Sequence, residues 1–155
     1  MNQEVLKKKQ ELTVNIDLLA KLLARLQKDC GEIPWSEGGK TDPWDHIEAA
    51  MGLCIGGYIN ETRRAYEWLA DIQLEDGSWY ASYIDGKPLD ETRETNLSSY
   101  IAVGLYHYYL ITKDVDFLEK MWGTMSAAID FAVRLQAPTG EIYWAISPKM
   151  KVDQM

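Results

Sequence analysis

Hydrophobic side chains recur at helical spacing through most of the 155-residue chain. Apolar positions three and four residues apart predict a first helix over residues 4–28, which ends before Gly31. The same pattern predicts four more helices, with expected N-caps Asp42, Asn60, Asn96 and Asp114, over residues 43–58, 60–73, 96–112 and 114–136. The connection 76–95 alternates with period two around Asp85 and Gly86, which indicates a small β-hairpin. We expect a protein that is helical throughout except for residues 76–95.

The predicted helices are of two kinds. Those at 43–58 and 96–112 are apolar nearly all round and rich in small residues, as expected of helices that are packed on several sides. Those at 60–73 and 114–136 each carry a charged face. This difference predicts an inner layer of buried helices that is covered by an outer layer of amphipathic helices.

One short phrase occurs three times along the chain. A glutamine near a helix end is followed four residues later by a glycine and then by a tryptophan, in the sets Gln27, Gly31, Trp35; Gln73, Gly77, Trp79; and Gln136, Gly140, Trp144. The glycine supplies a left-handed helix C-cap. The glutamine amide can donate to unpaired carbonyls and so tie one helical hairpin to the next. We interpret Gln73 and Trp79 as structural residues that do not contact a substrate.

The second copy has a known counterpart. The segment RAYEWLADIQLEDGSW (64–79) resembles the QW motif of squalene and terpenoid cyclases, while the copies at 19–35 and 127–144 depart from that motif. Those cyclases, the protein prenyltransferases and the six-hairpin glycosidases share an α/α toroid whose inner helices surround a central cavity. The resemblance therefore implies an all-α protein with the α/α-toroid fold.

The five predicted helices are too few for a complete toroid. We therefore expect residues 1–155 to form a single domain that is the N-terminal part of a larger toroid. The alternative is a homo-oligomer that covers the open edge, because a partial ring exposes apolar helix faces.

Composition excludes several classes of partner. The net charge of −8 disfavours nucleic acids, whose binding depends on clustered Lys and Arg. No apolar stretch is long enough to span a membrane and the first residues lack the apolar core of a signal peptide, so we expect a cytoplasmic protein. The two cysteines match no metal spacing, and neither a cofactor nor a metal site is evident. Six Trp and nine Tyr against two Phe suit the walls of a wet cavity.

Carboxylates gather in two stretches, 34–48 and 90–96, each of which leads into an inner helix. In a toroid both stretches would lie at the cavity mouth. Asp45 is expected to be held ionised by the helix dipole and to serve as a base or a cation stabiliser. The same dipole is expected to lower the pKa of an exposed His46, which would then act as a neutral hydrogen-bonding partner.

Glu94 is a general-acid candidate, together with Glu37 and Glu91. A neighbouring aromatic ring such as Trp44 would shield such a carboxyl and raise its pKa. An acid–base pair of this kind needs two carboxylates on loops that enter adjacent inner helices.

The resemblance leaves three functions open. The first is a prenyltransferase- or terpenoid-cyclase-like domain, in which a deep apolar tunnel between the helices at 43–58 and 96–112 would take an isoprenoid substrate. The DxDD and DDxxD patterns of such enzymes are absent, however. The second is a six-hairpin glycosidase-like domain, in which Trp35, Trp44 and Tyr83 would line a wet, acidic mouth for a saccharide. The third is a non-catalytic helical repeat scaffold.

Overall fold

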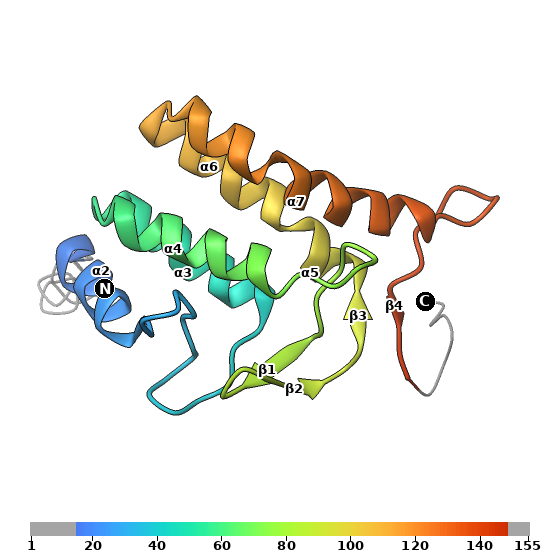
Figure 1. The fold of residues 1–155 in the computed structure, drawn as a ribbon, viewed down its shortest axis with the longest axis horizontal. Helices are drawn as coiled ribbons and strands as arrows, with labels where there is room; N and C mark the ends of the chain where they lie inside the picture. Colours follow the sequence, from blue (N-terminus) through green and yellow to red (C-terminus); the bar gives the residue numbers. More distant parts are fainter. Residues whose placement is uncertain (1–14, 149–155) are drawn as a thin grey trace, which may run out of the picture.

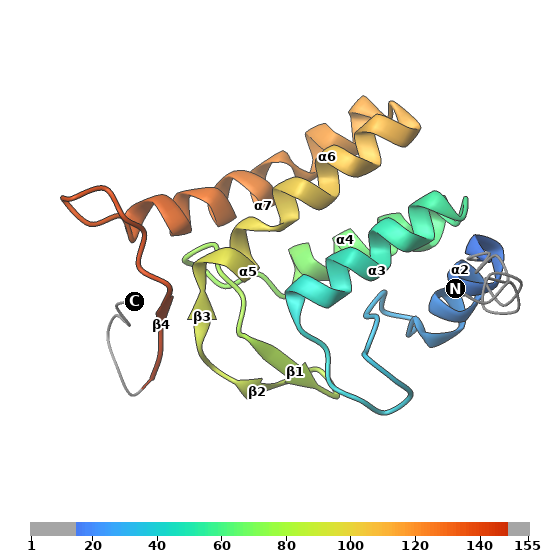
Figure 2. The ribbon, with the colours of Figure 1, turned by 180° about the vertical axis from the view of Figure 1, so that it is seen from behind.

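The structure is a computed structural model that describes residues 15–148. Its helices form two layers, as predicted (Figures 1 and 2). The inner layer contains α3 (Pro43–Ile55), α5 (Thr95–Ser99) and α6 (Ile101–Thr112), and the outer layer contains α2 (Ile16–Leu26), α4 (Ile59–Asp71) and α7 (Val115–Arg134). This all-α arrangement is a partial α/α toroid. Within residues 15–148, no helix is long and apolar enough to cross a membrane.

The small residues of the inner helices let neighbouring helices approach closely. A Cβ atom added to Gly104 of α6 would lie 2.6 Å from Cγ2 of Ile47 in α3 and 2.7 Å from the hydroxyl of Tyr66 in α4. A Cβ atom on Gly56, after α3, would overlap the side chain of Ala20 in α2. The space around Gly104 is therefore filled by packed side chains and is not part of an open tunnel between α3 and α6.

Two of the predicted N-caps are confirmed. The carboxylates of Asp42 and Asp114 each accept a hydrogen bond from the backbone N–H three residues further on, at 2.9 and 3.1 Å. The other two predictions are wrong, because Asn60 and Asn96 lie inside the first turns of α4 and α5, which begin without a side-chain cap. Residues 4–14 of the first predicted helix lie outside the described residues.

The predicted hairpin is confirmed and a second ladder is new. Strands β1 (Ser82–Ile84) and β2 (Lys87–Asp90) pair antiparallel across Asp85 and Gly86, whose φ angles of 48° and 71° suit a tight hairpin turn. Strand β3 (Arg93–Glu94) pairs with β4 (Ala145–Ile146), which lies beyond the last helix. The expectation of helix everywhere outside 76–95 is therefore wrong at β4, because a two-residue strand is too short to show an alternating pattern.

The repeated glutamines connect the outer helices. Nε2 of Gln27 donates to the carbonyl of Gly31 in its own turn, at 3.1 Å, and to the carbonyl of Glu61 on α4, at 2.8 Å. Nε2 of Gln73 makes the same two bonds, to its own turn and to the carbonyl of Thr124 on α7, both at 2.9 Å. We call this two-bond arrangement a glutamine bridge. The predicted role of the motif in tying successive hairpins together is confirmed for these two copies.

Trp79 closes the core behind the second glutamine bridge. Its side chain is fully buried, and its indole N–H donates to the carbonyl of Leu69 at 2.8 Å. The Trp79→Ala substitution removes both this bond and a large apolar volume. We expect the free energy of unfolding to fall by about 3 to 5 kcal/mol, measured by urea denaturation.

The matched control is Trp122→Ala, because Trp122 on α7 is 62% exposed. Its removal is expected to change the free energy of unfolding by less than about 0.5 kcal/mol. Equal losses for the two variants would contradict the structural role of Trp79.

Candidate functional site

The two acidic stretches lie at the same end of the molecule. The loop that leads into α3 is held against the hairpin by Thr41 and Tyr83, which exchange backbone hydrogen bonds of 2.9 and 2.8 Å. Glu94, in β3, leads directly into α5. Figure 2 shows the strands together with the starts of α3 and α5 at this end of the inner helices. We call this end the mouth.

Buried polar residues anchor the loop that precedes α3. Glu32 is almost fully buried, and its carboxylate accepts a hydrogen bond from the Thr41 hydroxyl at 2.7 Å and pairs with Lys28 at 3.0 Å. Burying a charge without such partners would be costly. The network therefore fixes the two ends of the loop relative to each other.

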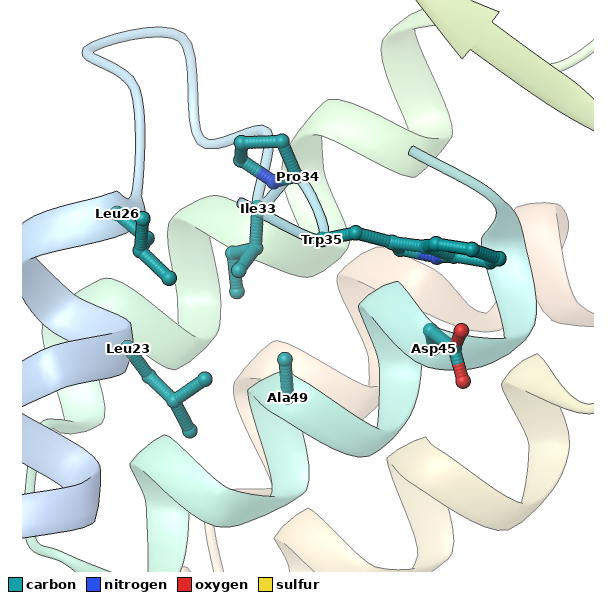
Figure 3. Close-up of a pocket in the computed structure, with 7 residues that line it drawn as sticks. All are labelled: Leu23, Leu26, Ile33, Pro34, Trp35, Asp45 and Ala49. Atoms are coloured by element: carbon teal, nitrogen blue, oxygen red, sulfur yellow. The ribbon is translucent and has the colours of Figure 1, made fainter. Parts of the chain in front are cut away.

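A pocket of about 360 Å³ opens between α2, α3 and this loop (Figure 3). Its volume lies in the range of small-molecule sites. Trp35 and Asp45 form its polar rim, and its walls are apolar: Leu23, Leu26, Ile33, Pro34 and Ala49.

Trp35 is held at the rim by polar contacts. Its indole N–H donates to the Asp42 carboxylate at 2.5 Å, and the Lys40 ammonium lies 4.0 Å from the ring centre. The side chain is nevertheless 55% exposed, so ring surface is available to a ligand.

Asp42 is at the centre of the acidic cluster. It caps α3 and binds Trp35, and its charge raises the pKa values of both Asp45 and Glu94. For Asp45 the largest cause of the raised pKa is burial of its carboxyl, followed by the charge of Asp42. We expected the helix dipole to hold Asp45 ionised, but its pKa is raised, because burial of the carboxyl and the neighbouring acidic groups both favour its protonated form.

Glu94 is half-buried, and burial is the main cause of its raised pKa. The charges of Asp90 and Asp42 raise the pKa further, while a hydrogen bond with the Trp144 side chain lowers it. The direction of the shift matches the expectation for a general acid. The aromatic neighbour that the structure gives it is Trp144, however, and not Trp44.

Trp44 belongs to a second cluster, on the side of α3 that faces α6. Its ring stacks on Tyr100 with a centroid distance of 3.9 Å and an angle of 3°. Both side chains donate to Oε1 of Glu48, Trp44 at 2.9 Å and Tyr100 at 3.2 Å. Sequence reasoning missed Glu48 and Tyr100, although the spacing of Trp44 and Glu48 by one helical turn was a usable signal.

Two of the candidate residues are buried in the core and do not reach the surface of the mouth. His46 was expected to be exposed but is fully buried: Nδ1 accepts from the Ile33 N–H at 3.1 Å, and Nε2 lies 2.9 Å from the carbonyl of Ala65. Burial lowers its pKa to about 4. Tyr83 is 4% exposed, and its hydroxyl accepts from the backbone N–H of Tyr80 at 3.0 Å. Neither side chain lines the pocket.

Residues 15–148 contain no group of three or more His, Cys, Asp or Glu side chains that could hold a metal ion. The side chains at the mouth that could act chemically are carboxyl groups and aromatic rings.

Two relatives share sequence with the chain. It is 43% identical over 129 residues to the MMP endo-(1,4)-3-O-methyl-alpha-D-mannosidase of Mycolicibacterium hassiacum, an alignment that covers 83% of this chain and 36% of the relative. It is 30% identical over 83 residues to an uncharacterized glycosyl hydrolase of Methanocaldococcus jannaschii, covering 53% of this chain and 14% of the relative. The chain thus spans about a third of the mannosidase and less of the other relative. No model of a known protein family matches it.

A solved structure shares the fold. The cellobiose 2-epimerase of Bacillus thermoamylovorans superposes with a TM-score of 0.64 at 21% identity, over 90% of this chain and 39% of the epimerase chain. The relatives are glycosyl hydrolase-like, and they support the toroid that the sequence predicted. They do not support the prenyltransferase and terpenoid cyclase assignment, which rested on the QW resemblance and therefore on the fold alone.

His46 makes folding stability depend on pH. The unfolded chain protonates this imidazole near its ordinary pKa of 6.5, whereas the folded chain does so only near about 4. Its contribution to stability is therefore complete above pH 6.5 and is lost as the pH falls toward 4, by about 3 kcal/mol at most. Urea denaturation of the native chain and of His46→Gln at pH 7.5, 6, 5 and 4 measures this. The difference in the free energy of unfolding between the native chain and the variant should shrink as the pH falls. A difference that stays constant would show that His46 has the same pKa in the folded and the unfolded chain.

The effect of the Asp42 charge on the pKa values of Asp45 and Glu94 can be tested by titration. Asp42→Asn keeps a good N-cap residue but removes the charge. The pKa values of both Asp45 and Glu94 should fall, as measured by NMR titration of the side-chain carboxyl carbons. Glu141, whose pKa is lowered chiefly by a hydrogen bond from Thr139, is the internal control and should not move. If only the pKa of Asp45 fell, the charge of Asp42 would not act on Glu94, and Glu94 would not belong to the acidic cluster.

Proposed function

We propose that the chain is the part of a saccharide-acting α/α-toroid protein that supplies one side of its sugar-binding mouth. The observation that carries this proposal is the combination of exposed aromatic rings with carboxyl groups of raised pKa at one end of the inner helices. Aromatic faces stack on the apolar faces of sugar rings, while carboxyl groups bind hydroxyls and exchange protons. The similarity to the mannosidase supports the same substrate class.

The pocket also favours a particular kind of saccharide. Its walls are apolar and its rim is acidic, which suits a sugar that carries both methyl groups and free hydroxyls. The name of the mannosidase describes such a substrate, an α-(1,4)-linked 3-O-methyl-mannoside. We therefore propose an O-methylated hexose oligosaccharide as the ligand, with its methyl groups against the walls and its ring against Trp35.

Within this proposal, two acids have distinct roles. Glu94 is half-buried with a raised pKa, so it is the better proton donor to a glycosidic oxygen. Asp45 lies at the pocket rim below Trp35, where it would accept hydrogen bonds from sugar hydroxyls or act as the partner carboxylate (Figure 3). Trp44, with Tyr100 and Glu48, extends the binding surface toward α6. His46 is assigned the role of fixing the start of α3, since its ring binds two backbone groups.

Calorimetric titration with two oligosaccharides tests the ligand class. An α-(1,4)-linked 3-O-methyl-mannose oligomer should bind more tightly than the unmethylated oligomer of equal length, by about fourfold for each methyl group that is buried. Trp35→Ala should weaken binding of the methylated oligomer by about tenfold, because the ring surface at the rim is lost. Trp122→Ala, which removes a similarly exposed indole from α7, is the matched control and should bind normally. Equal affinity for both oligomers, unaffected by Trp35→Ala, would overturn the proposal.

A further inference from the structure

The third copy of the repeat has half of a glutamine bridge. Nε2 of Gln136 donates to the carbonyl of Gly140 in its own turn, at 2.7 Å. Among residues 15–148 it has no second acceptor, unlike the glutamines of the first two copies. The turn has the same conformation as theirs, since Gly140 has a φ angle of 106° and Gly31 one of 100°.

The third copy also lacks the close contact between its glycine and the backbone of a following helix. A Cβ atom on Gly31 would overlap the backbone carbonyl of Arg64 on α4, and one on Gly77 would overlap the carbonyl of Ala127 on α7. A Cβ atom on Gly140 would meet nothing within 4 Å. The first two turns are therefore pressed against the backbone of the following outer helix, and the third turn has no such helix beside it among the described residues.

The two complete bridges define what such a helix must offer. In α4 and α7 the carbonyl that accepts from glutamine lies three residues before the carbonyl that touches glycine, at Glu61 and Thr124. The residue after the glycine contact is a fully buried alanine in both helices, Ala65 and Ala128. The partner is therefore a helix with two accessible carbonyls one turn apart and a small residue next to the second one.

Further apolar surface extends along the same edge. On α6, Val103, Tyr106 and Leu110 are 47%, 62% and 48% exposed, and on α7 Val133 is 55% exposed. An inner and an outer helix would both find an apolar face here, as α3 and α4 do on the other side of these two helices (Figure 1).

We propose that the turn 136–140, with the exposed faces of α6 and α7, is the docking surface for a further helical hairpin of the same repeat, supplied by the same polypeptide. The relatives support this source, because the chain matches only 36% of the mannosidase and 39% of the epimerase chain. Residues 1–155 are then one part of a larger toroid. A second copy fits less well: the position of α2 that corresponds to Ala65 and Ala128 is Leu19, a bulkier side chain.

A chain lengthened at residue 148 by a second copy of residues 82–148 tests the proposal. The added segment contains a second α7, which carries the required carbonyls and alanine. Gln136→Met removes the amide donor of the first copy at similar size. In the lengthened chain it should reduce the folding equilibrium constant by about tenfold, the value of the new hydrogen bond between helices. In the original chain the reduction should be less than about twofold, because the bond to Gly140 that is lost there is exposed to water. Gln73→Met is the matched control and should be destabilising in both chains.

Urea denaturation and light scattering together separate the outcomes. A lengthened chain that unfolds as one cooperative unit and is sensitive to Gln136→Met supports the proposal. Equal effects of Gln136→Met in both chains, or a lengthened chain without a single cooperative transition, would overturn it. A dimer of the original chain that Gln136→Met dissociates would also overturn it, because the occupant would then be a second copy. No saccharide is needed, so the result is independent of the proposed ligand.

Discussion

The glutamine bridge is the interaction on which the arrangement of hairpins depends. An outer helix that ends in a glycine turn leaves carbonyls without partners. A carboxamide has two N–H groups, so one can donate to a carbonyl of its own turn and the other to a carbonyl of the next helix. Gln27 and Gln73 both do this. The bond to the next helix fixes how far neighbouring outer helices are shifted along their axes and how far apart they lie near the glycine turn. The packing of the inner helices then follows, because each is connected to an outer helix on either side.

The mouth depends on the same frame. The loop after the first bridge runs to the start of α3, and Glu32 and Thr41 bind it at both ends. This places Asp42 where it caps α3, binds Trp35 and raises the pKa values of nearby carboxyl groups. Charges of one sign are crowded there at some electrostatic cost, and the helix N-terminus offsets part of that cost. Stability and the proposed chemistry therefore share the same residues.

The sequence predicted the features that depend on local pattern. Apolar periodicity located the five helical segments, and the turn residues Asp85 and Gly86 located the hairpin. Features that depend on distant partners were missed. His46 follows a helix cap in sequence, yet the chain around Ile33 covers it, and burial is the cause that lowers its pKa. The partner of Trp44 is Tyr100, far along the chain, and no single-sequence pattern connects the two.

The three tryptophans of the repeat show how one motif can serve both fold and site. Trp79 is fully buried and stabilises the core, whereas Trp35 and Trp144 are 55% and 41% exposed. Each exposed indole has an acidic partner, Asp42 for Trp35 and Glu94 for Trp144. The repeat thus places an aromatic ring at the same end of the molecule in each copy. Whether the ring is buried or exposed follows the number of residues between the glycine and the tryptophan: Gly77 is two residues before Trp79, whereas the other two pairs are four residues apart. The longer spacing goes with an exposed ring beside an acid, which is the pairing on which the proposed saccharide site is based.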